Sequence, residues 1–321
     1  MKTKLALALS CAALLATSQM ATAGDSFNKP LRQQSNPQIQ QLLEQSIADL
    51  HLTRATRNKQ LSVALVDITD PNTPAMAQIN GDEMMYAASL PKIAILLAAF
   101  ESIREGKLKL TDDMRQTMTS MIRRSSNRAA TKMIRTVGIN YINQVLKSDK
   151  YRLYDPKHNG GLWVGKEYAS GVAKHRDPLH NLSHGATALQ TARFYYMLES
   201  GKLVSPEYSR QMKTMLGNPG INHKFVKGLS KSSPDALIFR KSGSWRDYHA
   251  DSALIEHNGR RYIAVALANN PKGGEWMTRL IQAMNEIIVD LHPGVVAGSV
   301  HADASQAAGV AGPRSSSKHL M

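Results

Sequence analysis

Cysteine is nearly absent from this sequence: the only one, Cys11, lies in an apolar run near the N-terminus. This excludes a disulfide within the chain, and it excludes thiol chemistry after residue 11. Beyond the N-terminus there is also no apolar run long enough to cross a bilayer. The stability of the protein must therefore come from a hydrophobic core, which 321 residues can build as one large domain or as two lobes.

Acidic residues are also scarce, with 25 Asp and Glu against 40 Lys and Arg. A basic surface favours anionic partners such as peptidoglycan carboxylates or lipid head groups, although a surface kept soluble by self-repulsion explains the same composition. Basic residues are not interleaved with aromatics as they are in a nucleic-acid groove. We therefore expect a monomer that acts on a small-molecule substrate, without a specific nucleic-acid partner or stable membrane insertion.

The N-terminus has the features of a secretion signal. Lys2 and Lys4 precede an apolar run over residues 5–16, and small residues at 21 and 23 provide a signal-peptidase site. The apolar run is too short to span a membrane. We therefore expect residues 1–23 to be a signal peptide that is cut after Ala23, which makes the protein periplasmic or secreted.

Hydrophobic periodicity predicts strands at both ends of the chain and helices between them. The predicted strands are residues 61–68, 75–79, 236–241, 252–256 and 261–268, with an Asn-Gly turn between the last two. The predicted helices are residues 36–50, 89–105, 111–147 with a break near Gly138, 186–198, 206–215 and 276–291. Residues 153–183 are predicted to be a loop.

This order predicts an α+β fold in which an antiparallel sheet is covered by the N- and C-terminal helices and carries a helical lobe. A cleft between two lobes is a natural ligand site. The predicted boundaries are a flexible segment at 24–36, one domain at 37–296 with an α/β lobe (37–88 and 220–296) and a helical lobe (89–219), and a disordered Ala/Ser/Gly-rich tail at 297–321.

Ser89 and Lys92 stand three residues apart at the start of a predicted helix. Residues at this spacing share one helix face, so the lysine amine can approach the serine hydroxyl and activate it as a nucleophile. Alone, the pair is better explained as a helix cap and a surface lysine. Two more segments favour the catalytic interpretation of the pair. Ser125-Ser126-Asn127 begins a predicted helix, and Lys241-Ser242-Gly243 ends a predicted strand.

In their order and structural setting these three segments resemble the three motifs of class A β-lactamases and penicillin-binding proteins. The resemblance covers roughly residues 36–293. It implies a class A β-lactamase-like fold and an acyl-enzyme mechanism without a metal or another cofactor. It also implies that Ser89 attacks a carbonyl carbon, that Lys92 is its base or proton relay, and that Ser125 passes a proton to the leaving nitrogen.

The resemblance also assigns the substrate-binding residues. Asn127 would hold a side-chain amide of the substrate or orient Lys92. Lys241 and Ser242 would bind the substrate carboxylate, and Lys241 would help to keep Lys92 neutral. Gly243 would let the strand edge lie against the substrate. The backbone N–H groups of Ser89 and Ser244 would form the oxyanion hole.

The sequence departs from the family pattern at the residue that activates the deacylating water. The family has a glutamate there, whereas residues 154–159 contain none. Glu167 is the nearest replacement, although its spacing differs and an ordinary loop carboxylate is the alternative. His158 is a second candidate. Without such a base acylation proceeds, but hydrolysis of the ester stalls.

Two smaller departures and one possible metal site remain. The stretch between Lys92 and Ser125 is short, near residues 107–111. Trp245 stands where the family has a small residue, so it forms a wall of the cleft or packs in the core. Three histidines in the predicted loop have metal-like spacing but lack a rigid element, so we expect no metal site; they are His175, His180 and His184.

The sequence therefore predicts an exported serine hydrolase of β-lactams or related carboxylate-bearing amides. One alternative is a penicillin-binding D-alanyl-D-alanine peptidase with slow deacylation. The other is a non-catalytic relative that binds the cell wall through its basic cleft.

Overall fold

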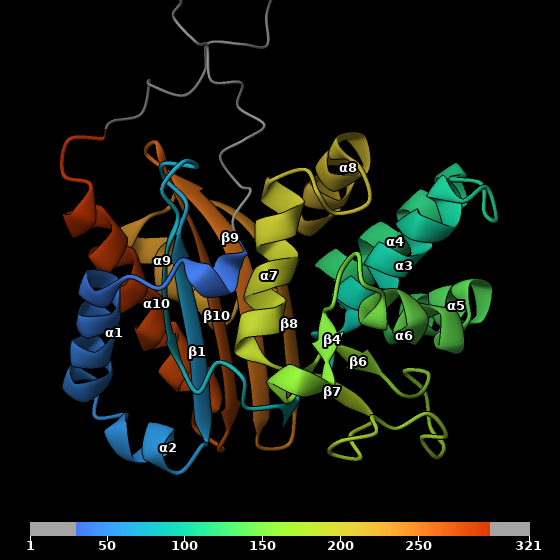
Figure 1. Cartoon of the computed structure of the whole chain (residues 1–321), viewed down its shortest axis with the longest axis horizontal. Helices are drawn as coiled ribbons and strands as arrows, with labels where there is room; N and C mark the ends of the chain where they lie inside the picture. The colour runs from blue at the N-terminus through green and yellow to red at the C-terminus, as the bar shows by residue number, and fades with distance from the viewer. Residues whose placement is uncertain (1–29, 296–321) are drawn as a thin grey trace, which may run out of the picture.

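The computed structural model describes residues 30–295 and is built around a five-stranded antiparallel sheet of order β2-β1-β10-β9-β8 (Figure 1). The predicted signal peptide and tail lie outside the described residues. The strands are β1 (Leu61–Asp67), β2 (Ala75–Ile79), β8 (Leu237–Trp245), β9 (Tyr248–His257) and β10 (Arg260–Asn269). The predicted α+β class is confirmed.

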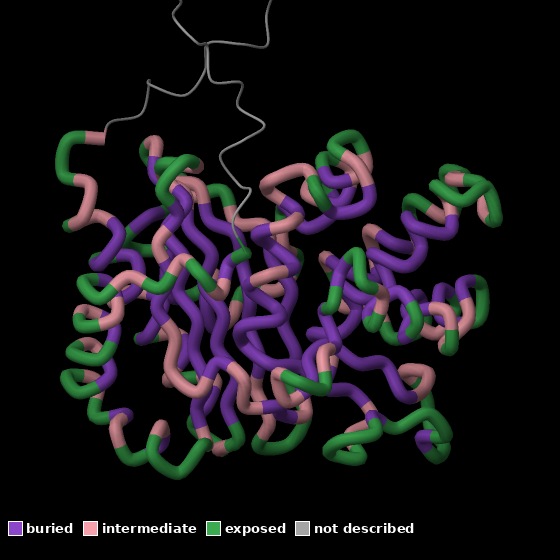
Figure 2. Tube along the Cα trace, in the orientation of Figure 1, coloured by how far each residue is buried: buried purple, intermediate pink, exposed green. Residues whose placement is uncertain are grey.

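Each central strand supplies two hydrophobic cores, because successive side chains point to opposite faces of a sheet. In β1, Ala64 and Val66 belong to one core, and Val63 and Leu65 belong to the other. A strand with both faces covered is apolar throughout, and all of β1 is buried. Figure 2 shows the same burial along the neighbouring strands.

One face of the sheet is covered by helices from the two ends of the chain: α1 (Pro37–Asp49), α9 (Phe225–Ser232) and α10 (Gly273–Leu291). The side chain of Asn36 caps α1 by accepting hydrogen bonds from the N–H groups of Gln38 and Ile39. The short helix α2 (Thr53–Arg57) follows. Within residues 30–295, no helix combines the length and the apolar character that crossing a bilayer requires.

The other face carries α7 (Ala188–Glu199), α8 (Pro206–Leu216) and the helical lobe. The lobe consists of α3 (Lys92–Arg104), α4 (Asp112–Arg123), α5 (Asn127–Val137) and α6 (Ile139–Lys147). Helix α7 lies directly on β1 and β10 (Figure 1), so it covers the sheet and does not belong to the lobe predicted for residues 89–219. The reason is that α7 is apolar on most sides and is buried against the sheet.

The predicted loop at 153–183 contains short strands. β3 (Met85–Tyr86), β7 (His184–Ala186) and β6 (Trp163–Val164) form one small sheet, and β4 (Tyr154–Asp155) pairs with β5 (Gly160–Gly161). β3 leads into the turn before α3. This small sheet therefore attaches the loop to the segment that contains Ser89.

The structure corrects the prediction of a flexible segment at 24–36 for the part of it that is described. Residues 31–33 form a short 3-10 helix, in which Leu31 is buried in the core. Arg32 forms a two-pronged ion pair with Asp82, and Ser35 bridges to Met76. These contacts join distant parts of the chain, so the local composition did not reveal them.

Candidate active site

Ser89 lies in the turn between β3 and α3, directly before the helix that begins at Lys92. Ala88 precedes it with φ of 48°, a left-handed conformation that is unfavourable for a residue with a Cβ. Pro91 stands at the N-cap, where its missing N–H leaves no helical hydrogen bond unmade. The turn therefore holds the nucleophile in a strained backbone segment beside a helix N-terminus.

Lys92 connects the first two motifs. Its Nζ lies 3.1 Å from Ser89 Oγ and donates hydrogen bonds to the Ser125 carbonyl oxygen at 2.6 Å and to Asn127 Oδ1 at 2.7 Å. The side chain is fully buried. Burial disfavours the charged amine and lowers the pKa of Lys92 to about 7. Much of the lysine is therefore neutral near pH 7 and able to accept the Ser89 proton.

The second motif is a sharp turn between α4 and α5. Ser126 caps α5 by accepting a hydrogen bond from the Ala129 N–H at 3.2 Å. Ser125 has φ of 53°, and both its carbonyl and its hydroxyl lie beside Lys92 Nζ. The middle serine is thus structural, whereas Ser125 and Asn127 contact Lys92. The helical stretch predicted over 111–147 is interrupted here, where residues 125–127 were predicted to begin a helix, as well as at Gly138.

The third motif brings a second amine to Ser125. Lys241 on β8 donates to Ser125 Oγ at 2.9 Å and to the Ser242 carbonyl at 2.5 Å. Its side chain is buried, and burial together with the charge of Lys92 holds the pKa of Lys241 well below the usual lysine value. The Ser252 hydroxyl fixes the strand by donating to the Lys241 carbonyl at 2.9 Å.

Gly243 lies where β8 meets the nucleophile turn. A Cβ at this position would overlap with the Ala87 carbonyl oxygen and lie 2.8 Å from Ser89 N. Only glycine allows so close an approach. It brings the strand segment that contains Ser244 next to the backbone N–H of Ser89, the two donors expected to form an oxyanion hole.

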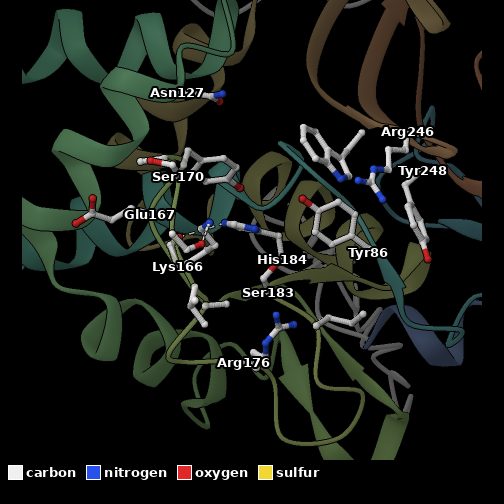
Figure 3. Close-up of a pocket in the computed structure, with 17 residues that line it drawn as sticks. Tyr86, Asn127, Lys166, Glu167, Ser170, Arg176, Ser183, His184, Arg246 and Tyr248 are labelled. Carbon is white, nitrogen blue, oxygen red and sulfur yellow. Dashed lines mark hydrogen bonds between the residues drawn. The ribbon is translucent and has the colours of Figure 1, made fainter.

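A cleft of about 840 Å³ is lined by one residue of the three motifs, Asn127, and by Tyr168 and Trp245; the residues lining it are drawn in Figure 3. Asn127 contributes from the helical lobe, and Tyr86 and Tyr248 contribute from the sheet side. Trp245 lines the cleft and is 57% exposed, which fits the cleft-wall interpretation rather than core packing. Three cationic side chains also line it: Lys166, Arg176 and Arg246.

Comparisons with known proteins agree with this geometry. A model of the β-lactamase enzyme family matches residues 41–117 and 113–291, which is most of the chain. This chain belongs to the β-lactamase enzyme family. Membership supports a serine β-lactamase-like hydrolase. Among proteins with curated descriptions, none matches the sequence.

Solved structures of the family share the fold at low identity. A β-lactamase from Sphaerobacter thermophilus is 17% identical, with a TM-score of 0.60 over 77% of this chain and 96% of its own. The protein PBP-A is 19% identical, with a TM-score of 0.57 over 78% of this chain and 96% of its own. A β-lactamase from Chitinophaga pinensis is 13% identical, with a TM-score of 0.59 over 77% of this chain and 99% of its own.

Two basic residues behind the third motif were not predicted. His223 Nε2 lies 3.1 Å from Ser242 Oγ, and burial lowers the pKa of His223 to about 4. Lys224 donates to the Gly243 carbonyl at 2.6 Å and to Ser244 Oγ at 2.8 Å, with backbone angles φ 50° and ψ −116°. Both residues precede α9, a helix that the sequence analysis did not predict. Nothing in the sequence therefore indicated that they contact β8.

Tyr168 is a further site residue that was not predicted. Its hydroxyl donates a hydrogen bond to the Ala88 carbonyl oxygen at 3.0 Å. Lys92 Nζ lies 4.4 Å from the centre of its ring, and the ring of His184 lies 4.3 Å away on the cleft side. Its neighbour Glu167 was the residue singled out from the sequence, whereas it is Tyr168 that bonds to the residue before Ser89.

Neither candidate for the deacylating base lies beside the nucleophile. Both carboxylate oxygens of Glu167 accept hydrogen bonds from Arg135 at 2.8 Å, which lowers the pKa of Glu167. Figure 3 shows this carboxylate pointing away from His184. His158 pairs instead with Asp155 at 2.8 Å. Among residues 30–295, no hydrogen bond joins either candidate to Ser89 or Lys92.

The three loop histidines have separate partners. His184 Nε2 lies 3.2 Å from the Lys166 carbonyl oxygen, and burial lowers the pKa of His184 to about 4. His180 Nε2 lies 2.9 Å from Asn159 Oδ1, and the backbone of His175 accepts a hydrogen bond from Trp163. Within the described part of the chain, no group of three or more His, Cys, Asp or Glu side chains is arranged to hold a metal ion.

Proposed function

We propose that this protein is an exported serine hydrolase that forms an acyl-enzyme on Ser89 with β-lactams or related amides that carry a carboxylate. One observation carries the proposal. Lys92, buried and with a pKa of about 7, lies 3.1 Å from the Ser89 hydroxyl and contacts Ser125 and Asn127 of the second motif. A serine with a neutral amine at this distance has the base that nucleophilic attack requires.

In the acylation step, neutral Lys92 accepts the Ser89 proton while Oγ attacks the carbonyl carbon. The carbonyl oxygen becomes negative, and the N–H groups of Ser89 and Ser244 stabilise it; one such donor is typically worth about 3 kcal/mol. The carbon–nitrogen bond then breaks. The leaving nitrogen takes a proton from the Ser125 hydroxyl, and Lys92 returns the proton it took to Ser125.

The hydrogen bonds of Ser125 support this role. Its Oγ accepts from Lys241 at 2.9 Å and lies 3.3 Å from Lys92 Nζ. Because both amines approach the oxygen, the hydroxyl proton is free to point toward a substrate atom. A bound carboxylate near Lys241 would favour the protonated amine, since an opposite charge raises a depressed lysine pKa.

A second candidate function is a penicillin-binding peptidase that acylates but deacylates slowly. The observation that favours it is the ion pair between Glu167 and Arg135. Because its carboxylate is paired with Arg135, Glu167 is not positioned to activate a water molecule beside Ser89. Water needs an activating base to attack an ester efficiently. A variant of PBP-A has been solved as an acyl-enzyme complex with penicillin G, which shows that this fold holds such an adduct in that protein.

Intact mass spectrometry after mixing with benzylpenicillin tests the proposal. We expect a mass increase of one penicillin on the wild type and none on Ser89→Ala, with Ser126→Ala as a control that keeps the nucleophile. Rapid loss of the adduct together with nitrocefin turnover supports the hydrolase. A persistent adduct supports the peptidase. A wild type that forms no adduct but binds cell-wall sacculi overturns both enzymatic functions and supports a non-catalytic relative.

A further inference from the structure

We propose that Tyr168 is a positioning residue for the oxyanion hole: its hydroxyl fixes the peptide group between Ala88 and Ser89, whose N–H stabilises the oxyanion. This inference rests on the proposed function and identifies a residue that controls the rate of its acylation step. The observation behind it is the 3.0 Å hydrogen bond from the Tyr168 hydroxyl to the Ala88 carbonyl oxygen.

The Ala88 carbonyl and the Ser89 N–H belong to one planar peptide group. A trans peptide is rigid, and its C=O and N–H point in opposite directions. A hydrogen bond that fixes the direction of the carbonyl therefore also fixes the direction of the N–H. It further polarises the peptide and strengthens the N–H as a donor, by an estimated 10–30% per bond in a chain of hydrogen bonds.

The conformation of Ala88 explains why this peptide needs an external hydrogen bond. With φ of 48°, Ala88 is in a region that residues with a Cβ rarely adopt. Ala88 also lies in a turn, so no strand or helix hydrogen bond fixes its ψ angle, and rotation about ψ would turn the Ser89 N–H away from the substrate. The neighbouring peptide, between Ala87 and Ala88, is held independently, because the Ala87 carbonyl accepts a hydrogen bond from the Leu90 N–H at 3.0 Å. The Tyr168 bond holds the one peptide that carries the oxyanion donor.

Tyr168 is itself held firmly enough to do this. The backbone N–H of Gly165, three residues earlier, donates to the Ser183 carbonyl at 2.6 Å and attaches the loop to the small sheet. The ring packs against His184 on one side, and Lys92 Nζ lies 4.4 Å from its centre. Burial raises the pKa of Tyr168 well above the usual value, so the phenol stays protonated and remains a donor.

The matched test is Tyr168→Phe, which removes the hydroxyl and keeps the ring over Lys92. The binding constant and the acylation rate for benzylpenicillin are measured separately by rapid-quench mass spectrometry. We expect the acylation rate to fall about 5- to 30-fold, less than the 100-fold or greater effect of deleting an oxyanion donor outright. The binding constant should change less than about twofold, because the ground-state carbonyl makes little use of that donor.

A tetrahedral adduct gives an independent readout. Phenylboronic acid accepts the Ser89 Oγ lone pair at boron and places an oxygen where the oxyanion forms. Its affinity for Tyr168→Phe should fall by a factor similar to the acylation rate, as expected for a group that acts on the transition state. The control is Tyr262→Phe, which loses a comparable buried bond to Asn285 in the core on the opposite face of the sheet.

The outcomes separate the two proposals. A wild type that reacts with penicillin while Tyr168→Phe has the same acylation rate overturns the positioning role and leaves the proposed function intact. Equal losses in Tyr168→Phe and Tyr262→Phe would assign the effect to stability and also overturn it. A wild type that binds neither penicillin nor the boronate covalently overturns the proposed function and this inference together.

Discussion

Lys241 Nζ donates a hydrogen bond to Ser125 Oγ at 2.9 Å, although the two residues are 116 positions apart. Lys92 Nζ lies 3.3 Å from the same oxygen. A single hydroxyl therefore lies between two buried amines. Burial lowers the pKa of both lysines, and the nearby charge of Lys92 lowers the pKa of Lys241 further. This arrangement would allow a proton to pass between Lys92 and Lys241 through the Ser125 hydroxyl.

The acylation rate is expected to rise with pH. Lys92 is a base only when neutral, and its pKa is about 7. Below pH 7 the rate constant for adduct formation should fall about tenfold per pH unit. Measuring benzylpenicillin acylation between pH 5 and 9 checks this. A rate that is flat from pH 5 to 7 would contradict the role of Lys92 as the base.

Lys92→Met is expected to abolish acylation and to stabilise the fold. The pKa of Lys92 falls from 10.5 to about 7 on folding, so the unfolded chain binds more protons between these pH values and wild-type stability rises with pH across that range. Removing the buried amine should raise the free energy of unfolding at pH 7 by about 4 kcal/mol.

This stabilisation should be full below pH 7 and should shrink as the pH approaches 10.5, where folded and unfolded wild type are both largely neutral at Lys92. Urea unfolding at pH 7 and pH 10 measures it. Lys132→Met is the control, since Lys132 is exposed and pairs only with Asp113 at the surface. A destabilised Lys92→Met protein at pH 7 would show that the hydrogen bonds of the amine outweigh the effect of its burial.

Gly243→Ala is expected to reduce acylation at least about 100-fold, because the added methyl group pushes β8 away from Ser89 and separates the two oxyanion donors. The expected loss of stability is about 1–3 kcal/mol from overpacking. Gly274→Ala is the control, since the nearest atom to its Cβ is 3.5 Å away in His249. Penicillin labelling and thermal melts measure both effects. Normal labelling of Gly243→Ala would mean that the strand does not complete the oxyanion hole.

Glu167→Gln is expected to leave the lifetime of the acyl-enzyme within about twofold of wild type. The carboxylate is paired with Arg135, outside contact with Ser89. The salt bridge is near the surface, so its loss should leave the free energy of unfolding almost unchanged. Following adduct decay by mass spectrometry checks this. A much longer lifetime of the acyl-enzyme in Glu167→Gln would contradict this prediction and support Glu167 as the deacylating base.

The sequence predicted those features that local patterns encode. Strands β1 and β2 and helix α1 follow from apolar periodicity and from the Asn36-Pro37 start of the helix. The motifs around Ser89, Ser125 and Lys241 were found because each one stands at the end of an element, where a side chain can face a neighbouring segment.

The remaining parts of the site depend on contacts between distant residues. Tyr168 contacts the carbonyl of Ala88, 80 residues earlier. Lys224 bonds to Gly243, 19 residues later, from a turn with unusual backbone angles. Neither tyrosine nor lysine in a loop carries a periodic signal, so these roles appear only when the chain is folded. The same holds for Leu31, whose burial depends on contact with the rest of the core.

The close approach of Gly243 to the nucleophile turn also bears on the order in which this protein is made. Ser89 and its lysine leave the ribosome long before β8 exists, so a nascent chain carries the nucleophile but lacks the strand that completes its oxyanion hole. Reactivity arises only after the C-terminal third has folded back onto the turn. Under the proposed function, incomplete or misfolded copies are therefore expected to be inert toward acylating compounds, and covalent labelling should count only molecules whose synthesis and folding are finished.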